Sequence, residues 1–356
     1  MKGSQMKQFA STNVHQLSRR DFLKVAGGLG ISAAGMTLLD ACGAGPATAT
    51  PIAEDAPLET TTIKLIRTPS LCLAPLYMAE DLLKEAGFTD VQYAQVTTVN
   101  TNKIISSGEA DIGGHFSPPV MIGLDVGAPL LILSGLHVGC FVLFGGKGVD
   151  TIQDLKGKHV AITEIGGSEH IFISSMAAYV GLDPRDIDWI THPFQESKQL
   201  FADGKLDAFL AFPPIAQELR AKKIGHEVVN SMMDDPWSQY YCCMIIGNRD
   251  FVEKNPVATK RAMRSILLAA DICASDPERA AHFVVDKGYT TNYDYALAAM
   301  KEIPFGVWRT YDPVDTLTFY ALLLHEVGMT KSSPDEIISK GTNWQFLNEL
   351  KVEMKE

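Results

Sequence analysis

From Thr61 onwards, short runs of apolar and β-branched residues alternate with longer stretches in which apolar positions recur every three or four residues. The short runs are typical of strands, and the longer stretches are typical of helices that pack one face on a sheet. This alternation predicts an α/β fold with largely parallel sheets. The expected strands are residues 63–66, 91–96, 110–113 and 130–134 in a first unit, and 160–163, 187–191, 208–211 and 227–230 in a second.

Two helical patterns are especially clear. The first covers residues 168–180 and is followed by Gly181, and its apolar face comprises Ile173, Met176, Ala177 and Val180. The second begins at Asn255-Pro256, and its apolar face comprises Met263, Ile266, Leu267 and Ala270. Each helix should pack one face on a sheet or on other helices.

Strand patterns nearly disappear after Cys243, and helical patterns continue to the C-terminus. Two α/β units followed by a helical region predict a first lobe built from both ends of the chain and a second lobe inserted between them. The expected bounds are 61–138 and 244–356 for lobe 1 and 139–243 for lobe 2. The chain should cross between the lobes near Gly139-Cys140 and near Tyr241-Cys242.

A leader precedes this domain. It contains SRRDFLK, in which Arg19 and Arg20 match the signal of the twin-arginine export system, and it ends in LDAC, which resembles a lipoprotein cleavage site before Cys42. A transmembrane anchor is the alternative, but a span needs about 20 apolar residues and this run is shorter. We expect a signal peptide over 1–41 and a lipid anchor at Cys42, on the extracytoplasmic face of the membrane (periplasm or cell surface).

Composition adds two expectations. Residues 42–60 are rich in Ala, Thr, Pro and Gly and contain no aromatic residue, which predicts a flexible tether. The whole chain has 31 basic and 42 acidic side chains, a net charge of −11, and its basic residues are scattered. A nucleic-acid partner is therefore excluded.

Four segments carry a family resemblance: APLYMAEDLLKEAGF (74–88), SGEADIGGHFSPPV (107–120), DLKGKHVAITEIGGSEHIF (154–172) and ADGKLDAFLAFPP (202–214). Their order and spacing resemble the periplasmic solute-binding proteins of ABC importers for nitrate, sulfonates, taurine and thiamine-pyrimidine precursors, over nearly all of residues 61–330. The resemblance implies a type II periplasmic binding protein fold, in which two hinged lobes close on a solute and present it to an ABC permease and its ATPase. We expect a monomer that has no cofactor and is not an enzyme.

In open parallel sheets, ligands bind beyond the carboxyl ends of the strands. Four loops should lie there, at residues 69–75, 114–118, 164–168 and 212–214. The third contains Gly166-Gly167 before a helix, which predicts either a small anion cradle or a plain turn, and the flanking Glu164 and Glu169 argue against a strongly anionic ligand. The candidate ligand-binding residues in these loops are Ser70, Cys72, His115, Ser117, Gly167, Ser168 and Phe212.

Aromatic residues gather before the second crossing, at Trp237, Tyr240 and Tyr241. They predict stacking on a planar organic ligand, with hinge packing as the alternative. Arg67 and His137 are candidates to pair with a carboxylate or sulfonate of that ligand, and His115 is either a ligand group or a satisfied loop histidine. The expected solute is a sulfonate, a pyrimidine or another aromatic or heteroaromatic compound rather than nitrate.

Five cysteines follow Cys42. Cys273 lies on a helix face and is expected to be a core residue, whereas Cys72, Cys140, Cys242 and Cys243 should converge on the hinge side of the cleft. None has the short paired spacing of a zinc ribbon, so buried inert thiols are the main expectation and no metal site is predicted. A disulfide such as Cys72 with Cys140, and metal or thiol chemistry by these four residues, are the alternatives.

Two other functions compete with that of a solute receptor. One is an enzyme similar to the eukaryotic thiamine-pyrimidine synthases, but their longer cysteine run is interrupted here, because Cys242-Cys243 is followed by Met244. The other is a ligand sensor that signals through a membrane receptor. No nucleophile elbow, Ser-His-Asp order or Rossmann fingerprint suggests a further enzyme class.

Overall fold

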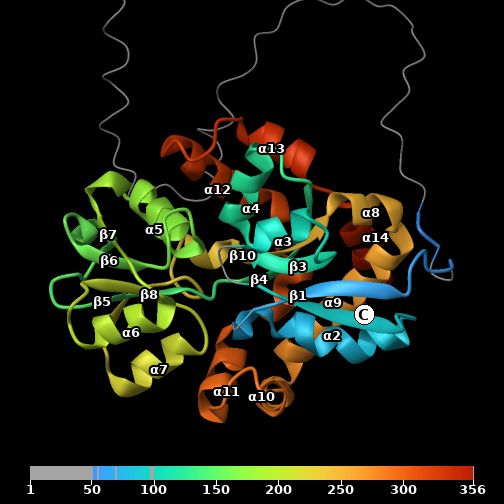
Figure 1. The fold of residues 1–356 in the computed structure, drawn as a ribbon, viewed down its shortest axis with the longest axis horizontal. Coiled ribbons are helices and arrows are strands. Elements are labelled where there is room, and N and C mark those ends of the chain that lie inside the picture. The colour runs from blue at the N-terminus through green and yellow to red at the C-terminus, as the bar shows by residue number, and fades with distance from the viewer. Residues whose placement is uncertain (1–50, 54–55, 69, 97–99, 356) are drawn as a thin grey trace, which may run out of the picture.

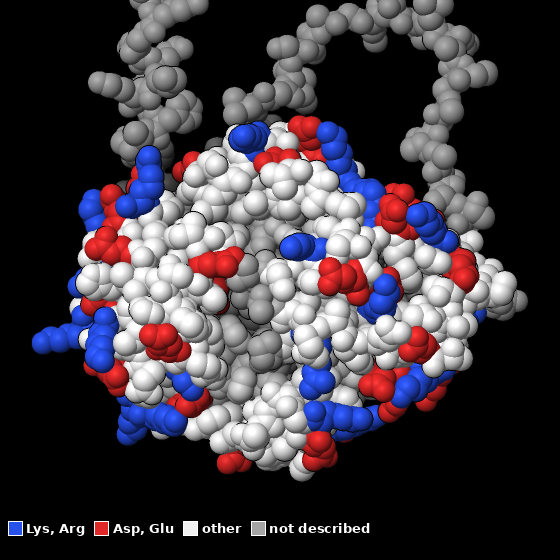
Figure 2. All heavy atoms as spheres, viewed as in Figure 1, with Lys and Arg blue, Asp and Glu red and all other residues white. Residues whose placement is uncertain are grey.

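The computed structural model describes residues 51–53, 56–68, 70–96 and 100–355, so the expected signal peptide, with Arg19, Arg20 and Cys42, lies outside the described residues. Two lobes lie side by side, each built on a five-stranded sheet with helices on both faces (Figure 1). Within the described ranges, no helix is long and apolar enough to cross a membrane. Acidic and basic side chains are interspersed over the face drawn in Figure 2, which is hollowed between the lobes.

The first lobe contains the sheet β2-β1-β3-β10-β4. Its strands are β1 (Thr62–Arg67), β2 (Asp90–Gln95), β3 (Ile112–Phe116), β4 (Leu130–Val138) and β10 (Tyr241–Asn248). Strand β10 was not expected as a strand, and it runs antiparallel to both β3 and β4 at the centre of this sheet. Strand β10 follows the second lobe in the chain and pairs with strands that are distant in sequence, so local sequence does not specify its place.

The second lobe contains the sheet β7-β6-β8-β5-β9. Its strands are β5 (Val142–Gly145), β6 (His159–Ile162), β7 (Asp188–Thr191), β8 (Ala208–Ala211) and β9 (His226–Asn230). Strand β5, also unexpected, pairs antiparallel with β8 and β9. Each sheet is therefore mixed, with four strands running in one direction and a single strand, β10 or β5, running against them. The expectation of largely parallel sheets is confirmed apart from this one strand in each sheet.

Helices cover both sheets. In the first lobe, α3 and α4 lie on one face and α2 and α9 on the other, while α5 and the pair α6 and α7 cover opposite faces of the second sheet (Figure 1). The apolar positions predicted within α5 and α9 are buried, which confirms those helices, whereas Val180 lies just after α5 and is half-buried. The helices are α2 (Ala74–Glu85), α3 (Thr101–Ser106), α4 (Ser117–Asp125), α5 (Ser168–Tyr179), α6 (Phe194–Ala202), α7 (Ile215–Lys222), α8 (Arg249–Lys254), α9 (Pro256–Ser275), α10 (Pro277–Asp286), α11 (Tyr293–Glu302), α12 (Pro313–Glu326), α13 (Pro334–Gly341) and α14 (Gln345–Glu353).

Two chain segments connect the lobes. The first joins β4 to β5 through Gly139, whose φ of 51° and close approach to the Ser231 carbonyl, 2.5 Å from where a Cβ would lie, both require glycine. The second runs over residues 231–240, because β10 already starts at Tyr241 within the first sheet. The second crossing thus ends a few residues earlier than the sequence suggested.

The last part of the predicted tether is held against the first lobe. The Glu59 carboxylate accepts hydrogen bonds from the backbone N–H groups of Val257 and Ala258, at 2.9 and 3.0 Å, and so caps the start of α9. Lys260 donates to the Ile52 carbonyl at 2.8 Å and pairs with Glu353 of α14 at 2.6 Å. Residues 51–53 and 56–60 therefore do not behave as a free linker, since their partners lie about 200 or more residues away in sequence.

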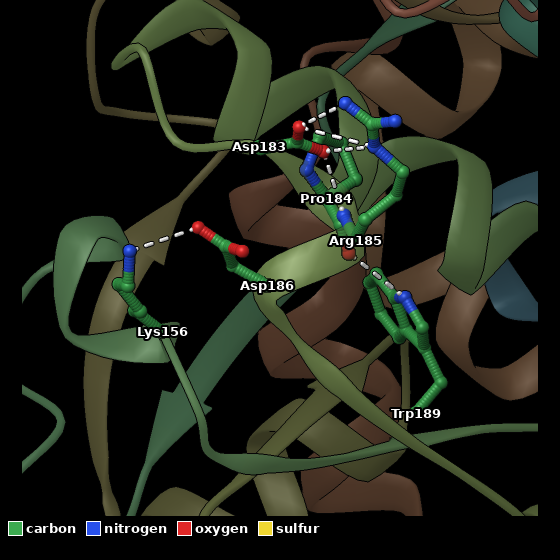
Figure 3. A network of polar contacts seen from close by, with 6 residues as sticks. All are labelled: Lys156, Asp183, Pro184, Arg185, Asp186 and Trp189. Atoms are coloured by element: carbon green, nitrogen blue, oxygen red, sulfur yellow. Dashed lines mark hydrogen bonds and ion pairs between the residues drawn. The ribbon is translucent and has the colours of Figure 1, made fainter.

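A satisfied polar network holds the connection between α5 and β7 (Figure 3). Asp183 accepts from both the backbone and the guanidinium of Arg185, Lys156 pairs with Asp186 at 2.9 Å, and the Trp189 indole donates to the Pro184 carbonyl at 3.1 Å. The hydrogen bonds from Arg185 lower the pKa of Asp183 to about 2. The polar groups of this connection are therefore satisfied by one another, which gives no indication of a ligand site there.

Candidate functional site

The four predicted loops meet between the lobes, and the lobes touch there. The Leu71 N–H of the first loop donates to the Pro213 carbonyl of the second lobe at 3.3 Å. The rings of Phe116 in β3 and Phe172 in α5 have centroids 4.9 Å apart. On the rim, Glu302 of α11 accepts from Gln217 and Arg220 of α7 at 2.9 and 2.6 Å. The molecule is therefore in a closed form.

The closed cleft keeps a cavity of about 40 Å³. Such a volume exceeds the roughly 15 Å³ that one water needs, but is far below the ~300 Å³ or more of a typical organic ligand site. Five predicted residues line it, namely Ser70, Cys72, His115, Ser168 and Phe212, together with Thr68, Leu73, Thr101, Gly114, Phe116, Cys140, Phe141 and Cys243.

Three residues that line the cavity, Cys72, Cys140 and Cys243, form with the buried His137 a group that we call the Cys–His cluster. Their three sulfurs and one imidazole nitrogen all lie within 4.8 Å of one another. Cys243 of β10 pairs directly with His137 of β4 and with Phe116 of β3. Cys72 comes from the short helix η2 (Leu71–Leu73) after β1, and Cys140 follows the Gly139 turn.

The backbone irregularity beside the cluster explains how its side chains converge. Register shifts in the β10–β4 ladder fall on both sides of Cys243. Such bulges commonly re-aim side chains near functional sites. Here the shift places the Cys242 sulfur 3.2 Å from that of Cys140, although neighbouring strand residues normally face opposite sides.

His137 has one ring nitrogen engaged and one unengaged. Its Nδ1 lies 2.8 Å from the Gly139 carbonyl oxygen, which can only accept, so Nδ1 carries a proton. Its Nε2 is fully buried and has no hydrogen-bond partner of good geometry. A buried polar atom left in this way is costly unless something binds it.

The pKa values of the cluster residues are shifted in different directions. Hydrogen bonds from Cys140, Cys242 and Cys72 lower the pKa of Cys243 well below its usual value, and the nearby His137 adds to this effect. Burial opposes the charge on His137, but the Cys243 and Cys72 sulfurs raise its pKa well above its usual value. Burial raises the pKa of Cys140 well above normal. Among the cysteines of the cluster, Cys243 therefore has the lowest thiol pKa.

All five described cysteines are free thiols, so the suggested Cys72–Cys140 disulfide is not formed. The 3.2 Å between the Cys140 and Cys242 sulfurs is also well beyond a covalent bond of about 2.05 Å. Cys273 lies apart in α9, near the Met78 sulfur at 3.5 Å, as expected for a core residue.

Two other predicted residues have different surroundings. Burial lowers the pKa of His115 to about 4, so its imidazole is neutral at physiological pH and lines the cavity. The Ser117 hydroxyl donates to the carbonyls of Tyr241 and Cys242, at 3.1 and 3.0 Å. Ser117 therefore fixes the start of β10, and its hydroxyl does not line the cavity.

The second lobe's glycine loop has little free hydrogen-bonding capacity. Gly166 N–H donates to His170 Nδ1 at 3.3 Å, and Gly167 N–H donates to the Glu164 carbonyl at 3.2 Å. Glu169 is buried, and one of its oxygens has no partner. Burial raises its pKa above the usual value. This arrangement is a turn beside a buried carboxyl group, which does not favour an anion.

The aromatic residues of the second crossing pack on one another. Tyr240 stacks on Phe319 at 4.0 Å between centroids, and Trp237 meets the edges of Phe172, Phe319 and Tyr179. Neither Trp237 nor Tyr240 lines the cavity. Arg67 lies 4.3 Å over the ring of Tyr289, so it too is engaged elsewhere.

The fold matches solved two-lobed binding proteins. The periplasmic nitrate-binding protein NrtA from Synechocystis aligns with a TM-score of 0.71 at 18% identity, over 84% of this chain and 90% of that one. The alkanesulfonate-binding protein SsuA from Xanthomonas axonopodis, bound to MOPS, aligns with a TM-score of 0.66 at 15% identity, over 80% of this chain and 99% of that one. The protein therefore has the periplasmic binding protein fold.

The family model described as NMT1/THI5 like matches residues 72–280, and the chain belongs to that family. Its relatives include the nitrate/nitrite binding protein NrtA of Nostoc, 24% identical over 77% of this chain and 71% of the relative. They also include the 4-amino-5-hydroxymethyl-2-methylpyrimidine phosphate synthase THI5 of Saccharomyces cerevisiae, 23% identical over 58% of this chain. The match spans 64% of the length of that synthase.

Proposed function

We propose that this protein is the substrate-binding lipoprotein of an ABC importer, which captures a small solute between its lobes and delivers it to a permease. The observation that carries this proposal is the closed cleft, where loops from both lobes enclose a cavity of about 40 Å³ beside a group of buried polar side chains. A receptor that encloses its solute presents one closed shape to its partner. The leader and Cys42 would hold the chain beside the permease.

The volume of the closed cavity favours a smaller solute than the aromatic compound expected from the sequence. Phe116, Phe141 and Phe212 line the cavity, but its volume in the closed form leaves no room for a planar aromatic ring beside them. The Trp237 and Tyr240 rings are already packed. A solute of a few heavy atoms fits this closed form better, and larger compounds need wider separation of the lobes.

A ligand panel tests the proposal. Nitrate, bicarbonate, an alkanesulfonate, the hydroxymethylpyrimidine of the synthase relatives, an aromatic acid and a flavin are added separately, and thermal unfolding is followed. A true ligand at 100 times its dissociation constant stabilises the protein by about 2.7 kcal/mol, or about 5 °C in Tm. No shift with any compound would contradict a solute receptor.

A matched pair of variants connects binding to closure. Glu302→Gln removes a charge that bridges the lobes through Arg220, and it should weaken solute binding several-fold without touching the cavity. Glu278→Gln removes a comparable carboxylate that pairs with Lys301 within the first lobe at 2.8 Å, and should leave binding unchanged. Equal effects of the two variants would argue that closure is not part of binding.

A synthase-like enzyme is the second candidate, because the Cys–His cluster gives the cleft chemistry that simple binding does not need. The two candidates differ in outcome. A receptor releases its ligand chemically unchanged when it is denatured, whereas an enzyme of this kind releases a product. Mass spectrometry of the ligand before and after incubation separates them.

A further inference from the structure

We infer that the Cys–His cluster is a binding site for one soft divalent metal ion of the zinc type, held by the sulfurs of Cys72, Cys140 and Cys243 and by Nε2 of His137. This inference goes beyond the proposed transport function, and its test needs no solute. Three thiolates and one imidazole are a donor set that zinc takes with tetrahedral geometry. The four ligand atoms lie within 4.8 Å of one another, so a single ion can reach them all with small side-chain adjustments.

His137 already has the arrangement that metal-binding histidines use. Such residues donate their second ring N–H to a carbonyl or carboxylate, which fixes the tautomer and leaves the other nitrogen free for the metal. Nδ1 of His137 lies 2.8 Å from the Gly139 carbonyl oxygen, and Nε2 is buried without a partner. A buried ring nitrogen without a partner is available to a metal ion.

An outer contact supports one of the sulfurs as well. The Ser70 hydroxyl lies 3.1 Å from the Cys72 sulfur and can donate to it. A hydroxyl donor offsets part of the negative charge that three thiolates and one divalent ion leave in a buried site. Binding is balanced by release of the thiol protons to solvent.

The placement of the ligands indicates an ion that stays bound when the lobes open. Cys72, His137 and Cys243 belong to the first lobe, and Cys140 follows the Gly139 turn at the start of the first crossing. Lobe separation therefore leaves the four ligands together, whereas a transported solute must be released. Ser168 and Phe212 of the second lobe line the same cavity, so the ion would lie at the base of the cleft.

A disulfide between Cys140 and Cys242 is the competing use of these thiols, because their sulfurs are 3.2 Å apart. Oxidation would remove Cys140 as a ligand. The two uses exclude each other, and the same sample can be assayed for both by thiol counting and by metal analysis.

The test uses the full chain, purified with its thiols reduced and stripped of metal by a chelator. Titration with Zn²⁺ should saturate at one ion per chain with a dissociation constant below about 1 µM. Titration with Co²⁺ should give the visible absorption of a tetrahedral site with strong sulfur-to-cobalt charge transfer. This second readout needs no variant, so it stands even if a substitution prevents folding.

Variants then assign the ligands. Cys72→Ser, Cys140→Ser, Cys243→Ser and His137→Gln should each weaken Zn²⁺ binding by at least about 100-fold. Cys273→Ser is the matched control, because it replaces an equally buried thiol outside the cluster, and Cys242→Ser should also keep one ion. Circular dichroism of each metal-free variant checks folding.

The inference is overturned if the reduced protein binds no stoichiometric Zn²⁺, if Co²⁺ gives no sulfur charge transfer, or if the ligand variants bind as the control does. Loss of the ion during dialysis into metal-free buffer would contradict the inference that the ion stays bound when the lobes open. A solute panel without a hit would refute the receptor proposal and leave these titrations unaffected.

Discussion

The Cys–His cluster and the aromatic residues of the second crossing both lie near the interlobe cleft, yet they differ in what their side chains leave unsatisfied. Trp237 and Tyr240 are buried and fully engaged with other rings, so no free surface remains for a ligand. The cluster brings three free thiols around an imidazole nitrogen that has no partner. Complete contacts stabilise the fold, whereas a buried polar atom without a partner needs an explanation, which a bound ligand would supply at His137.

The largest effect is expected for Trp237→Ala. Removing a buried ring that contacts Phe172, Phe319 and Tyr179 should lower the free energy of unfolding by about 3–5 kcal/mol. Thermal denaturation measures this change, with Trp189→Ala, a half-buried indole of the Figure 3 network, as the milder control. Zinc binding should persist in both variants. If the Trp237 variant kept native stability but lost ligand or metal binding, Trp237 would belong to the binding site and not to the structural core.

A smaller loss of stability is expected for Gly139→Ala. The left-handed backbone and the clash with the Ser231 carbonyl should together cost about 2–3 kcal/mol and displace the carbonyl that orients His137. Gly157→Ala is the control, because its φ is also positive at 66° but nothing lies within 4 Å of the added carbon. Chemical denaturation and Zn²⁺ titration should show a loss of both stability and affinity only at Gly139.

Ser70→Ala tests the outer contact of the cluster. Loss of the hydroxyl next to the Cys72 sulfur should weaken Zn²⁺ binding about 10-fold and change stability by less than about 1 kcal/mol. Competition with a chelator of known affinity measures the change. Unchanged affinity would show that Ser70 has no part in the site.

The smallest effect concerns Glu169 on the second lobe. Its pKa is raised by burial above the usual 4.5, so ionisation costs folding free energy, and the penalty grows as the pH rises from about 4.5. Glu169→Gln keeps the acceptor for Thr163 and should stabilise the protein at pH 7 by on the order of 1 kcal/mol. The gain should vanish below about pH 4 in thermal scans, and a gain that persists there would contradict a charge effect.

Local patterns predicted α5, α9 and most of the strands, because these elements follow from the spacing of their own apolar residues. They did not predict β5 and β10, since both are placed by antiparallel pairing with distant strands. The same limit applies to the tether, whose residues 56–60 are held by Glu59 at the start of α9.

Only part of the candidate site was predicted: the cysteines were expected to converge on the hinge side of the cleft, whereas His137 was named only as a partner for a solute and no metal site was predicted. Cys72, His137, Cys140 and Cys243 were each named, yet no short metal-binding spacing connects them. The direct pairing of Cys243 with His137 and the turn at Gly139 create the cluster, and both depend on where β10 enters the sheet. The closest signal in the sequence was His137 three residues before Cys140, with a glycine between them.

The most direct test of this account is X-ray absorption spectroscopy at the zinc edge of the zinc-loaded protein. We predict three sulfur neighbours at about 2.3 Å and one nitrogen at about 2.0–2.1 Å. A first shell made only of oxygen and nitrogen, or with fewer than three sulfurs, would contradict a Cys–His metal site at the base of the cleft.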